Sequence, residues 1–174
     1  NGYLALFGAG FRLMKSEKNY VGKVPQWHYT IEINKHAVEI TTKPGFGEAS
    51  FQTAMSAGDK STLALAFFLA QLDLDPNLKD SIVVFDDPFT SLDDFRRVMT
   101  AKTIFRIGQN ASQVLVLSHD KYFLKEISDK IVGGAKCGTF QISSTKGNSA
   151  IETWDLEREV KEGYLQDHMV LQEF

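Results

Sequence analysis

Hydrophobic and polar residues alternate between Trp27 and Thr41. This period of two is typical of β-strands with one buried face. The alternation breaks at Asn34-Lys35, which predicts a hairpin with its turn at that point. A stretch containing Gly and Pro, from Lys43 to Gly47, then separates the hairpin from a different pattern.

The segment from Ser61 to Leu72 is rich in Ala and Leu and is apolar on nearly all sides. Such a composition predicts a helix that is buried on several sides rather than one that lies on a surface. The linker from Asp73 to Asp80, which contains Pro76, is expected to end this helix.

Two short apolar runs follow, Ile82 to Phe85 and Val114 to Leu117. Runs of this length are typical of parallel strands that are covered on both faces. Apolar residues recur at helical spacing between them, namely Phe95, Val98, Met99 and Phe105. Strand, helix and strand in this order predict a right-handed βαβ unit and therefore an α/β core with a mostly parallel sheet flanked by helices.

The remainder of the chain predicts three further elements. A helix is expected from about Lys121 to Lys130. A hairpin follows, with strands Thr139 to Ile142 and Ala150 to Trp154 and a turn at Lys146-Gly147-Asn148. The last element is an amphipathic helix whose apolar stripe is marked by Leu156, Val160 and Tyr164.

The composition fits one compact domain, since 43% of the 174 residues are apolar and 24% are charged. Within it we distinguish a hairpin-containing segment (1–50), a core (51–130) and a C-terminal hairpin and helix (131–174). The formal net charge of -3 gives no overall attraction to nucleic acid or to an anionic membrane, so any such contact must be local or made by other domains.

Cysteine usage and hydropathy indicate the expected cellular location of the protein. The single cysteine, Cys137, cannot form an intrachain disulfide, and a reducing cytoplasm is the expected location. The longest apolar run, Leu63 to Ala70, is much shorter than the roughly 20 residues of a membrane-spanning helix. No signal peptide is evident, and the start at Asn1 is typical of a segment of a longer protein.

Two carboxylates stand at the exit of the first apolar run, Asp86 and Asp87. A hard cation such as Mg2+ prefers oxygen ligands at a rigid position, which the end of a buried strand provides. The second carboxylate could orient or deprotonate an attacking water. The alternative is that both residues only end the strand before the turn at Pro88.

Small and polar residues precede the Ala/Leu helix in the segment from Met55 to Lys60. A helix start exposes unpaired N–H groups, Gly58 allows close backbone approach, and Ser56 carries a hydroxyl, so the segment could bind a phosphate. Similar residues precede many helices that bind nothing. In the same way, His119 at the end of the second apolar run is either a phosphate-sensing group or an ordinary polar residue at a strand end.

Taken together and in this order, the segments resemble the C-terminal half of an ABC-type ATPase domain. Met55 to Lys60 resembles the signature motif, Asp86 to Asp93 the Walker B motif and D-loop, and Val114 to Asp120 the segment of the switch histidine. Asp93 follows Asp86 by seven positions, as in that family, although Ser91 or Asp93 could equally be a helix N-cap.

The resemblance implies ATP and Mg2+ as cofactors and a role for each matching residue. Asp86 is expected to hold Mg2+. Asp87 and His119 are expected to be catalytic: Asp87 polarises the attacking water, and His119 contacts the γ-phosphate. The signature segment, with Ser56, Ala57, Gly58 and Lys60, is expected to bind the nucleotide of an opposite subunit, so that ATP joins a homodimer. Asp93 is expected to carry the signal between the two sites.

The chain departs from the family pattern at three positions. In the signature-like segment, Ala57 stands where the family usually has a first glycine, and Asp59 stands where it usually has glutamine or glutamate. Asp87 stands where a catalytic glutamate is common. The shorter Asp87 favours slow hydrolysis, and Lys60 is expected to offset the charge of Asp59. The G-x-x-x-x-G-K-[ST] phosphate loop does not occur, so the chain alone is expected to be inactive and to need an N-terminal lobe as partner.

An N-terminal lobe placed far upstream is the layout of coiled-coil ATPases of the SMC and DNA-repair kind. Three sequence segments look most similar to those of bacterial RloC- and PrrC-type anticodon-nuclease ATPases: SAGDKSTLALAFFLA, VVFDDPFTSLDD and LVLSHD. Three functions follow from the resemblance: an ATP-driven regulator of a nuclease that cleaves tRNA anticodons, a DNA-associated ATPase of the SMC type, or an inactive dimerisation scaffold.

Overall fold

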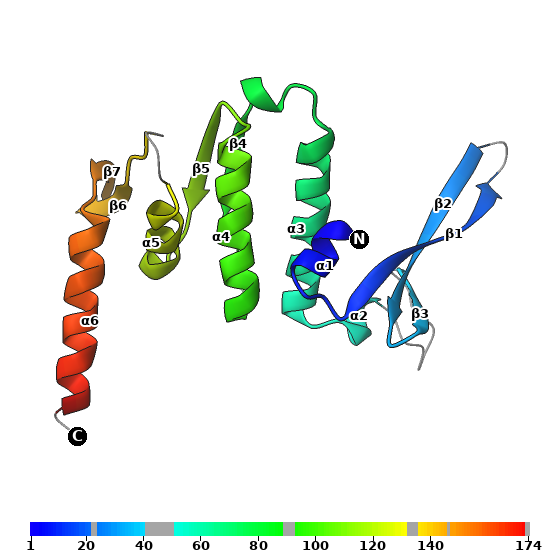
Figure 1. The fold of residues 1–174 in the computed structure, drawn as a ribbon, viewed down its shortest axis with the longest axis horizontal. Helices are drawn as coiled ribbons and strands as arrows, with labels where there is room; N and C mark the ends of the chain where they lie inside the picture. Colours follow the sequence, from blue (N-terminus) through cyan, green and yellow to red (C-terminus); the bar gives the residue numbers. More distant parts are fainter. Residues whose placement is uncertain (22–23, 41–50, 89–92, 132–135, 146, 173–174) are drawn as a thin grey trace. The chain divides into compact units, whose positions relative to one another are not determined.

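The structure is a computed structural model of residues 1–174 that describes all residues except 22–23, 41–50, 89–92, 132–135, 146 and 173–174. The chain divides into two compact units, one formed by Asn1–Leu78 with Pro88–Thr100 and the other by Lys79–Asp87 with Ala101–Phe174. Figure 1 labels the helices and strands along the chain. Each unit is described by itself below. The single domain expected from the sequence stays a prediction.

The first unit contains a three-stranded antiparallel sheet in the order β1 (Phe11–Val21), β2 (Val24–Ile33) and β3 (His36–Glu39). The turn between β2 and β3 consists of Asn34 and Lys35, which have φ angles of 49° and 67°. Two left-handed residues in a two-residue loop match the right-handed twist of the strands on either side. The predicted hairpin and its turn are therefore confirmed.

Strand β1 was not predicted from the sequence. It pairs with β2 along nearly its whole length, from Phe11↔Ile33 to Val21↔Val24, with a register shift between Lys15 and Lys18. The middle of this strand is polar, and the shift interrupts its alternation of apolar and polar residues. A periodicity of two therefore cannot be recognised there without knowledge of the partner strand.

The core of the first unit lies between the sheet and the helices α1 (Gly2–Leu6), α2 (Phe51–Ala54) and α3 (Ala57–Leu74). Its buried side chains are Leu4, Phe11, Ile31, Met55, Leu63 and Ala66. The buried positions of α3 lie along one face only, and Phe67 on another face is 49% exposed. Burial on several sides was thus a wrong prediction, because a helix rich in Ala and Leu has no polar face to reveal which side packs.

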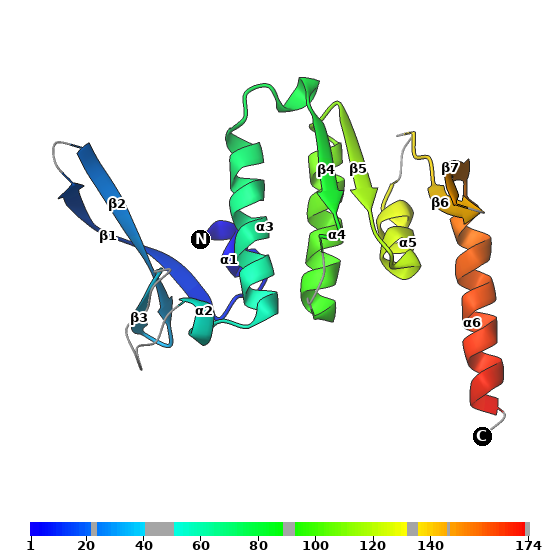
Figure 2. The ribbon, with the colours of Figure 1, turned by 180° about the vertical axis from the view of Figure 1, so that it is seen from behind.

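The second unit contains a parallel pair of strands, β4 (Ile82–Asp86) and β5 (Gln113–Leu117), shown side by side in Figure 2. The helix between them in the sequence is α4 (Asp94–Gly108), of which Ala101–Gly108 belongs to this unit. The predicted order of strand, helix and strand is confirmed. A short 3-10 helix, η1 (Leu78–Asp80), precedes β4.

Only one face of this strand pair is buried among the described residues. Val83 and Phe85 are 4% and 3% exposed, whereas Val84 is 47% and Leu117 48% exposed. The prediction of strands covered on both faces is therefore wrong for the described part of the chain. A continuous apolar run is compatible with either arrangement, because it does not specify what packs on its second face.

The C-terminal part of the second unit consists of α5 (Lys121–Asp129), β6 (Phe140–Thr145), β7 (Asn148–Thr153) and α6 (Leu156–Gln172). Strands β6 and β7 form the predicted antiparallel hairpin, and Gly147 at its turn has a φ of 85°. Leu156 and Val160 of α6 are buried as expected. Tyr164, predicted in the same stripe, is 61% exposed, although its ring lies 5.1 Å from that of Tyr122.

The fold is therefore mixed α/β, as predicted, but its sheets differ from the expectation. The described residues form three separate sheets, of which two are antiparallel and one is the parallel pair β4 and β5. The mostly parallel sheet expected from the sequence is not found among them. None of the described helices is long and apolar enough to cross a membrane.

Candidate functional site

Strands β4 and β5 run in parallel and end at the same edge, where Asp86 pairs with Leu117. The next residue, Asp87, continues this pairing, because its backbone N–H donates to the Leu117 carbonyl at 2.9 Å. Asp87 has a φ of 41°, in the left-handed region that Asp and Asn adopt more readily than most residues. The backbone thus turns sharply at the residue that follows the strand.

Asp87 contacts His119 directly across this edge. Oδ1 of Asp87 lies 3.0 Å from Nδ1 of His119 and accepts a longer bond, 3.3 Å, from the His119 backbone N–H. The side-chain hydrogen bond from His119 is the largest cause that lowers the pKa of Asp87 below its ordinary value. Asp87 is therefore an ionised acceptor at neutral pH, and its contact favours the His119 tautomer with a proton on Nδ1.

Asp86, the predicted metal ligand, is exposed at the last position of β4. No group of three or more His, Cys, Asp or Glu side chains that could hold a metal occurs among the described residues. This donor set nevertheless fits Mg2+, which usually binds through one or two carboxylates and completes its octahedron with water and substrate phosphates. Asp86 with Asp87 next to it could hold such an ion only together with a ligand that brings phosphate oxygens.

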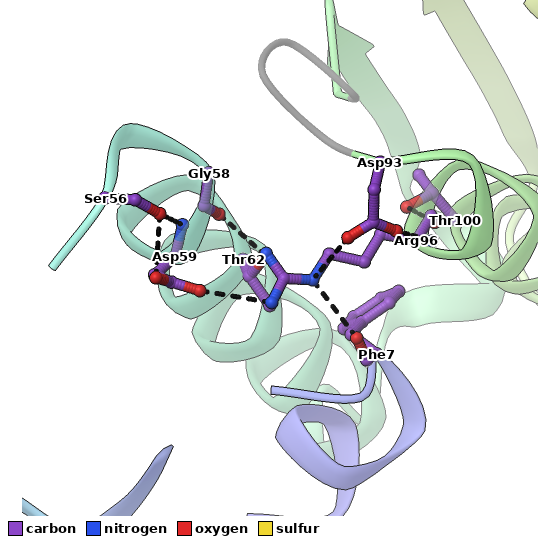
Figure 3. A network of polar contacts seen from close by, with 8 residues as sticks. All are labelled: Phe7, Ser56, Gly58, Asp59, Thr62, Asp93, Arg96 and Thr100. Carbon is purple, nitrogen blue, oxygen red and sulfur yellow. Dashed lines mark hydrogen bonds and ion pairs between the residues drawn. The ribbon is translucent and has the colours of Figure 1, made fainter. Parts of the chain in front are cut away.

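The predicted phosphate-binding segment forms the start of α3, in the first unit (Figure 3). Ser56 is the N-cap: its hydroxyl oxygen accepts from the Asp59 N–H at 3.1 Å and donates to Asp59 Oδ2 at 2.7 Å. The helix begins at Ala57, so that Ala57, Gly58 and Lys60 lie in its first turn and not before it, as the sequence suggested. The amides of Ala57 and Gly58 are among the unpaired donors at the helix N-terminus, whereas the Lys60 N–H already donates to the Ser56 carbonyl at 3.1 Å.

Asp93 is the predicted D-loop aspartate and precedes α4 in the first unit. Its Oδ1 accepts from the Arg96 N–H at 2.9 Å, and its carbonyl accepts from the Arg97 N–H at 2.9 Å. Asp93 is therefore an N-cap, which was the alternative considered for it and which is compatible with a further role. The preceding predicted residues, Thr90 to Leu92, lie outside the described residues.

Sequence reasoning missed Arg96. Its guanidinium donates to Asp59 Oδ1 at 3.1 Å and to the Phe7 carbonyl at 3.3 Å, and its Nε lies 3.5 Å from Asp93 Oδ2 (Figure 3). The side chain of Arg96 is only 14% exposed. Lys60, which was expected to offset Asp59, has its Nζ 5.9 Å from the centre of the Phe51 ring. The only sequence signal for Arg96 is its place three residues after Asp93.

The predicted site residues therefore form two local groups. Asp86, Asp87 and His119 lie at one edge of the parallel strand pair in the second unit. Ser56 lies at the start of α3, and Arg96 connects the Asp59 of this segment with Asp93 in the first unit. Carboxylates and a histidine at a strand edge, and a helix N-terminus with a hydroxyl, are both arrangements that suit phosphate chemistry.

Solved structures with a similar fold include SMC ATPases and Smc head domains. One comes from work on ATP-driven dimerization and DNA stimulated activation of SMC ATPases: it is 19% identical, with a TM-score of 0.63 over 97% of this chain and 87% of the other. The Smc head domain with a coiled coil and joint from Pyrococcus yayanosii is 18% identical, with a TM-score of 0.63 over 92% of this chain and 26% of that one.

A third structure is the Smc head domain with an extended coiled coil bound to the C-terminal domain of ScpA, from Pyrococcus furiosus. It is 19% identical, with a TM-score of 0.59 over 97% of this chain and 36% of the other. The chain thus spans only about a quarter and a third of the two Pyrococcus structures. These similarities show that its fold is similar to that of SMC ATPase heads.

The family described as AAA domain matches residues 27–166, which is most of the chain. The chain therefore belongs to the AAA domain family. No curated protein matches it in sequence.

Proposed function

We propose that this chain is the C-terminal half of an ATPase head that binds and hydrolyses ATP together with a lobe that carries the phosphate loop. The observation that carries the proposal is the contact of Asp87 with His119 at the shared edge of β4 and β5. Two groups of the types needed to orient a water and to contact a phosphate meet there, next to a second carboxylate, Asp86, that suits Mg2+.

The geometry supports a division of roles at this edge. Asp86 would hold Mg2+, which when bound neutralises charge on the phosphate oxygens. Asp87 orients the attacking water more than it deprotonates it, because a carboxylate with a lowered pKa is a weak base. Nδ1 of His119 is engaged with Asp87, so the ring is expected to contact the γ-phosphate through Nε2. Nε2 donates to a phosphate oxygen only in the ring form that carries a proton on both nitrogens.

The start of α3 takes the second role in the proposal. Ser56, Ala57, Gly58 and Lys60 bind the γ-phosphate of a nucleotide held by a second copy of the protein, and ATP thereby joins a homodimer. The amides of Ala57 and Gly58 at the start of α3 and the Ser56 hydroxyl support this role. Asp93 carries the signal between the two nucleotides, and dimer closure is the mechanical output.

Enzyme assays on the protein that includes the lobe with the phosphate loop test these roles. Asp87→Asn is expected to abolish ATP turnover while ATP binding persists, and Ser56→Arg is expected to abolish ATP-dependent dimerisation. Asp80→Asn and Ser149→Arg, at exposed positions, are the matched controls. Unchanged turnover in Asp87→Asn and in Ser56→Arg would remove the site assignment. Turnover that is unchanged in Ser56→Arg alone would remove only the arrangement across the dimer.

Among the three functions, the similar folds favour a DNA-associated role of the SMC type, since one of those structures comes from work on DNA stimulated activation of SMC ATPases. The alternative of a nuclease-regulating role is supported by the sequence similarity of three motifs. The alternative of an inactive scaffold is supported by the short side chain of Asp87 in place of glutamate. Turnover that rises on adding DNA supports the first role. Turnover that rises only with an attached nuclease domain supports the second, and ATP binding without turnover supports the third.

A further inference from the structure

Arg96 connects the starts of two helices that are distant in the sequence. It belongs to the first turn of α4, and its guanidinium contacts Asp59 in the first turn of α3. The same guanidinium lies beside Asp93, the N-cap of α4, and beside the carbonyl of Phe7 (Figure 3). One cation therefore serves two carboxylates and one backbone acceptor.

The charge of Asp59 makes this contact important for an anionic ligand. Asp59 lies three residues after Ser56, at the helix end whose amides and partial positive charge attract phosphate. An unpaired carboxylate at that place repels phosphate. Because Arg96 is only 14% exposed, solvent screens its attraction to Asp59 less than that of a surface cation.

The hydrogen bonds of Asp59 add a second consequence. Its Oδ2 accepts the Ser56 hydroxyl, while its Oδ1 accepts from Arg96. A serine hydroxyl has one proton, so Ser56 must turn away from Asp59 before it can donate to a phosphate. The bond from Arg96 holds the Asp59 carboxylate in place during that exchange.

We propose that Arg96 is a positioning residue, which neutralises Asp59 so that the start of α3 accepts phosphate and which ties this helix start to Asp93. The inference rests on the proposed function of Ser56 as a phosphate ligand. In this role, the charge of Arg96 lets phosphate bind near the Asp59 carboxylate. Arg96 also connects the signature-like segment mechanically with the D-loop aspartate, Asp93.

ATP-dependent dimerisation of the protein with its phosphate-loop lobe, followed by sedimentation against protein concentration, tests this role. Arg96→Met is expected to weaken the ATP-bound dimer about tenfold, and the weakening is expected to shrink at high salt because it arises from unscreened charge. Adding Asp59→Asn to Arg96→Met is expected to restore most of the dimer. Arg158→Met, which removes a cation from an exposed helical position, is the control.

A purely structural role of Arg96 predicts the opposite pattern. Dimerisation that is equally weak in Arg96→Met and in the double variant, or that does not depend on salt, would overturn the inference. Arg96→Lys, which keeps the charge, is the second variant: it is expected to dimerise better than Arg96→Met, and equal loss in the two also contradicts the inference. A wild-type protein that does not dimerise with ATP contradicts the proposed function itself.

Discussion

Nδ1 of His119 lies 3.0 Å from Oδ1 of Asp87, although 32 residues separate them in the chain. The contact exists because β4 and β5 are parallel and end in register, with Asp86 opposite Leu117. Asp87 and His119 each follow one of these ends by one or two residues. Parallel pairing of two short apolar strands is thus what assembles the candidate catalytic pair.

The lowered pKa of Asp87 depends on His119, and removal of the imidazole tests this dependence. In His119→Ala the pKa of the Asp87 carboxyl is expected to rise toward its ordinary value of about 3.9. A carbon NMR titration of the carboxyl measures this shift, with His36→Ala as the control. An Asp87 midpoint that is the same in both variants contradicts the assignment.

The same pKa predicts how the contact contributes to stability as the pH changes. A carboxyl whose pKa is lower in the folded protein stabilises the fold at pH values above its unfolded pKa of about 3.9. That contribution is lost as the pH falls through the lowered pKa. Wild type and His119→Ala are therefore expected to converge in stability under acid conditions and to differ at neutral pH, which urea unfolding at several pH values measures.

The left-handed backbone at Asp87 predicts that aspartate is preferred there to glutamate. The φ of 41° suits a short side chain that bonds locally, and a longer one is expected to lose about 1 kcal/mol of stability. Asp87→Glu should thus be less stable than Asp87→Asn in urea unfolding. If Asp87→Glu is the more stable of the two, the backbone does not explain the preference for aspartate at this position.

The cap at Ser56 predicts a stability effect that is separate from ligand binding. Ser56→Ala removes the acceptor of the Asp59 N–H and is expected to cost about 1 kcal/mol, whereas Ser56→Asn keeps an acceptor and should cost less. Thermal unfolding of the isolated chain without nucleotide measures both variants. Equal stability of Ser56→Ala and wild type would contradict the capping geometry.

Helix α3 offers a matched pair of substitutions that test which of its faces is buried. Leu63 is 7% exposed within the core of the first unit, and Phe67 on another face is 49% exposed. Leu63→Ala is expected to cost about 2 to 4 kcal/mol, and Phe67→Ala clearly less in spite of its larger side chain. Urea unfolding that shows the larger loss for Phe67→Ala would contradict the described packing.

Local patterns predicted much of this fold and the positions of its polar groups. The turn at Asn34-Lys35, the two apolar strands and the hairpin at Gly147 follow from periodicity and turn chemistry, which involve only near neighbours in the sequence. Because parallel strands end at one edge, the meeting of Asp87 with His119 could also be expected. The roles of these residues in catalysis remain predictions.

What could not be predicted depends on partners that are distant in the chain. Arg96 looks like one charged residue among many until the fold brings it to Asp59, and the polar strand β1 is recognisable only from its pairing with β2. In the same way, the apolar run Ile82 to Phe85 does not reveal that Val84 is half exposed. Tertiary contacts decided each of these features.

In the proposed function, the edge that holds Asp87 and His119 faces the triphosphate of a bound nucleotide. Nitrogen NMR of the His119 side chain checks this, during titration of a non-hydrolysable ATP analogue with Mg2+ into the protein that includes the phosphate-loop lobe. We expect a large shift at Nε2, a small one at Nδ1, and none at His36. Saturable binding of the analogue that leaves both nitrogens of His119 unchanged would contradict it.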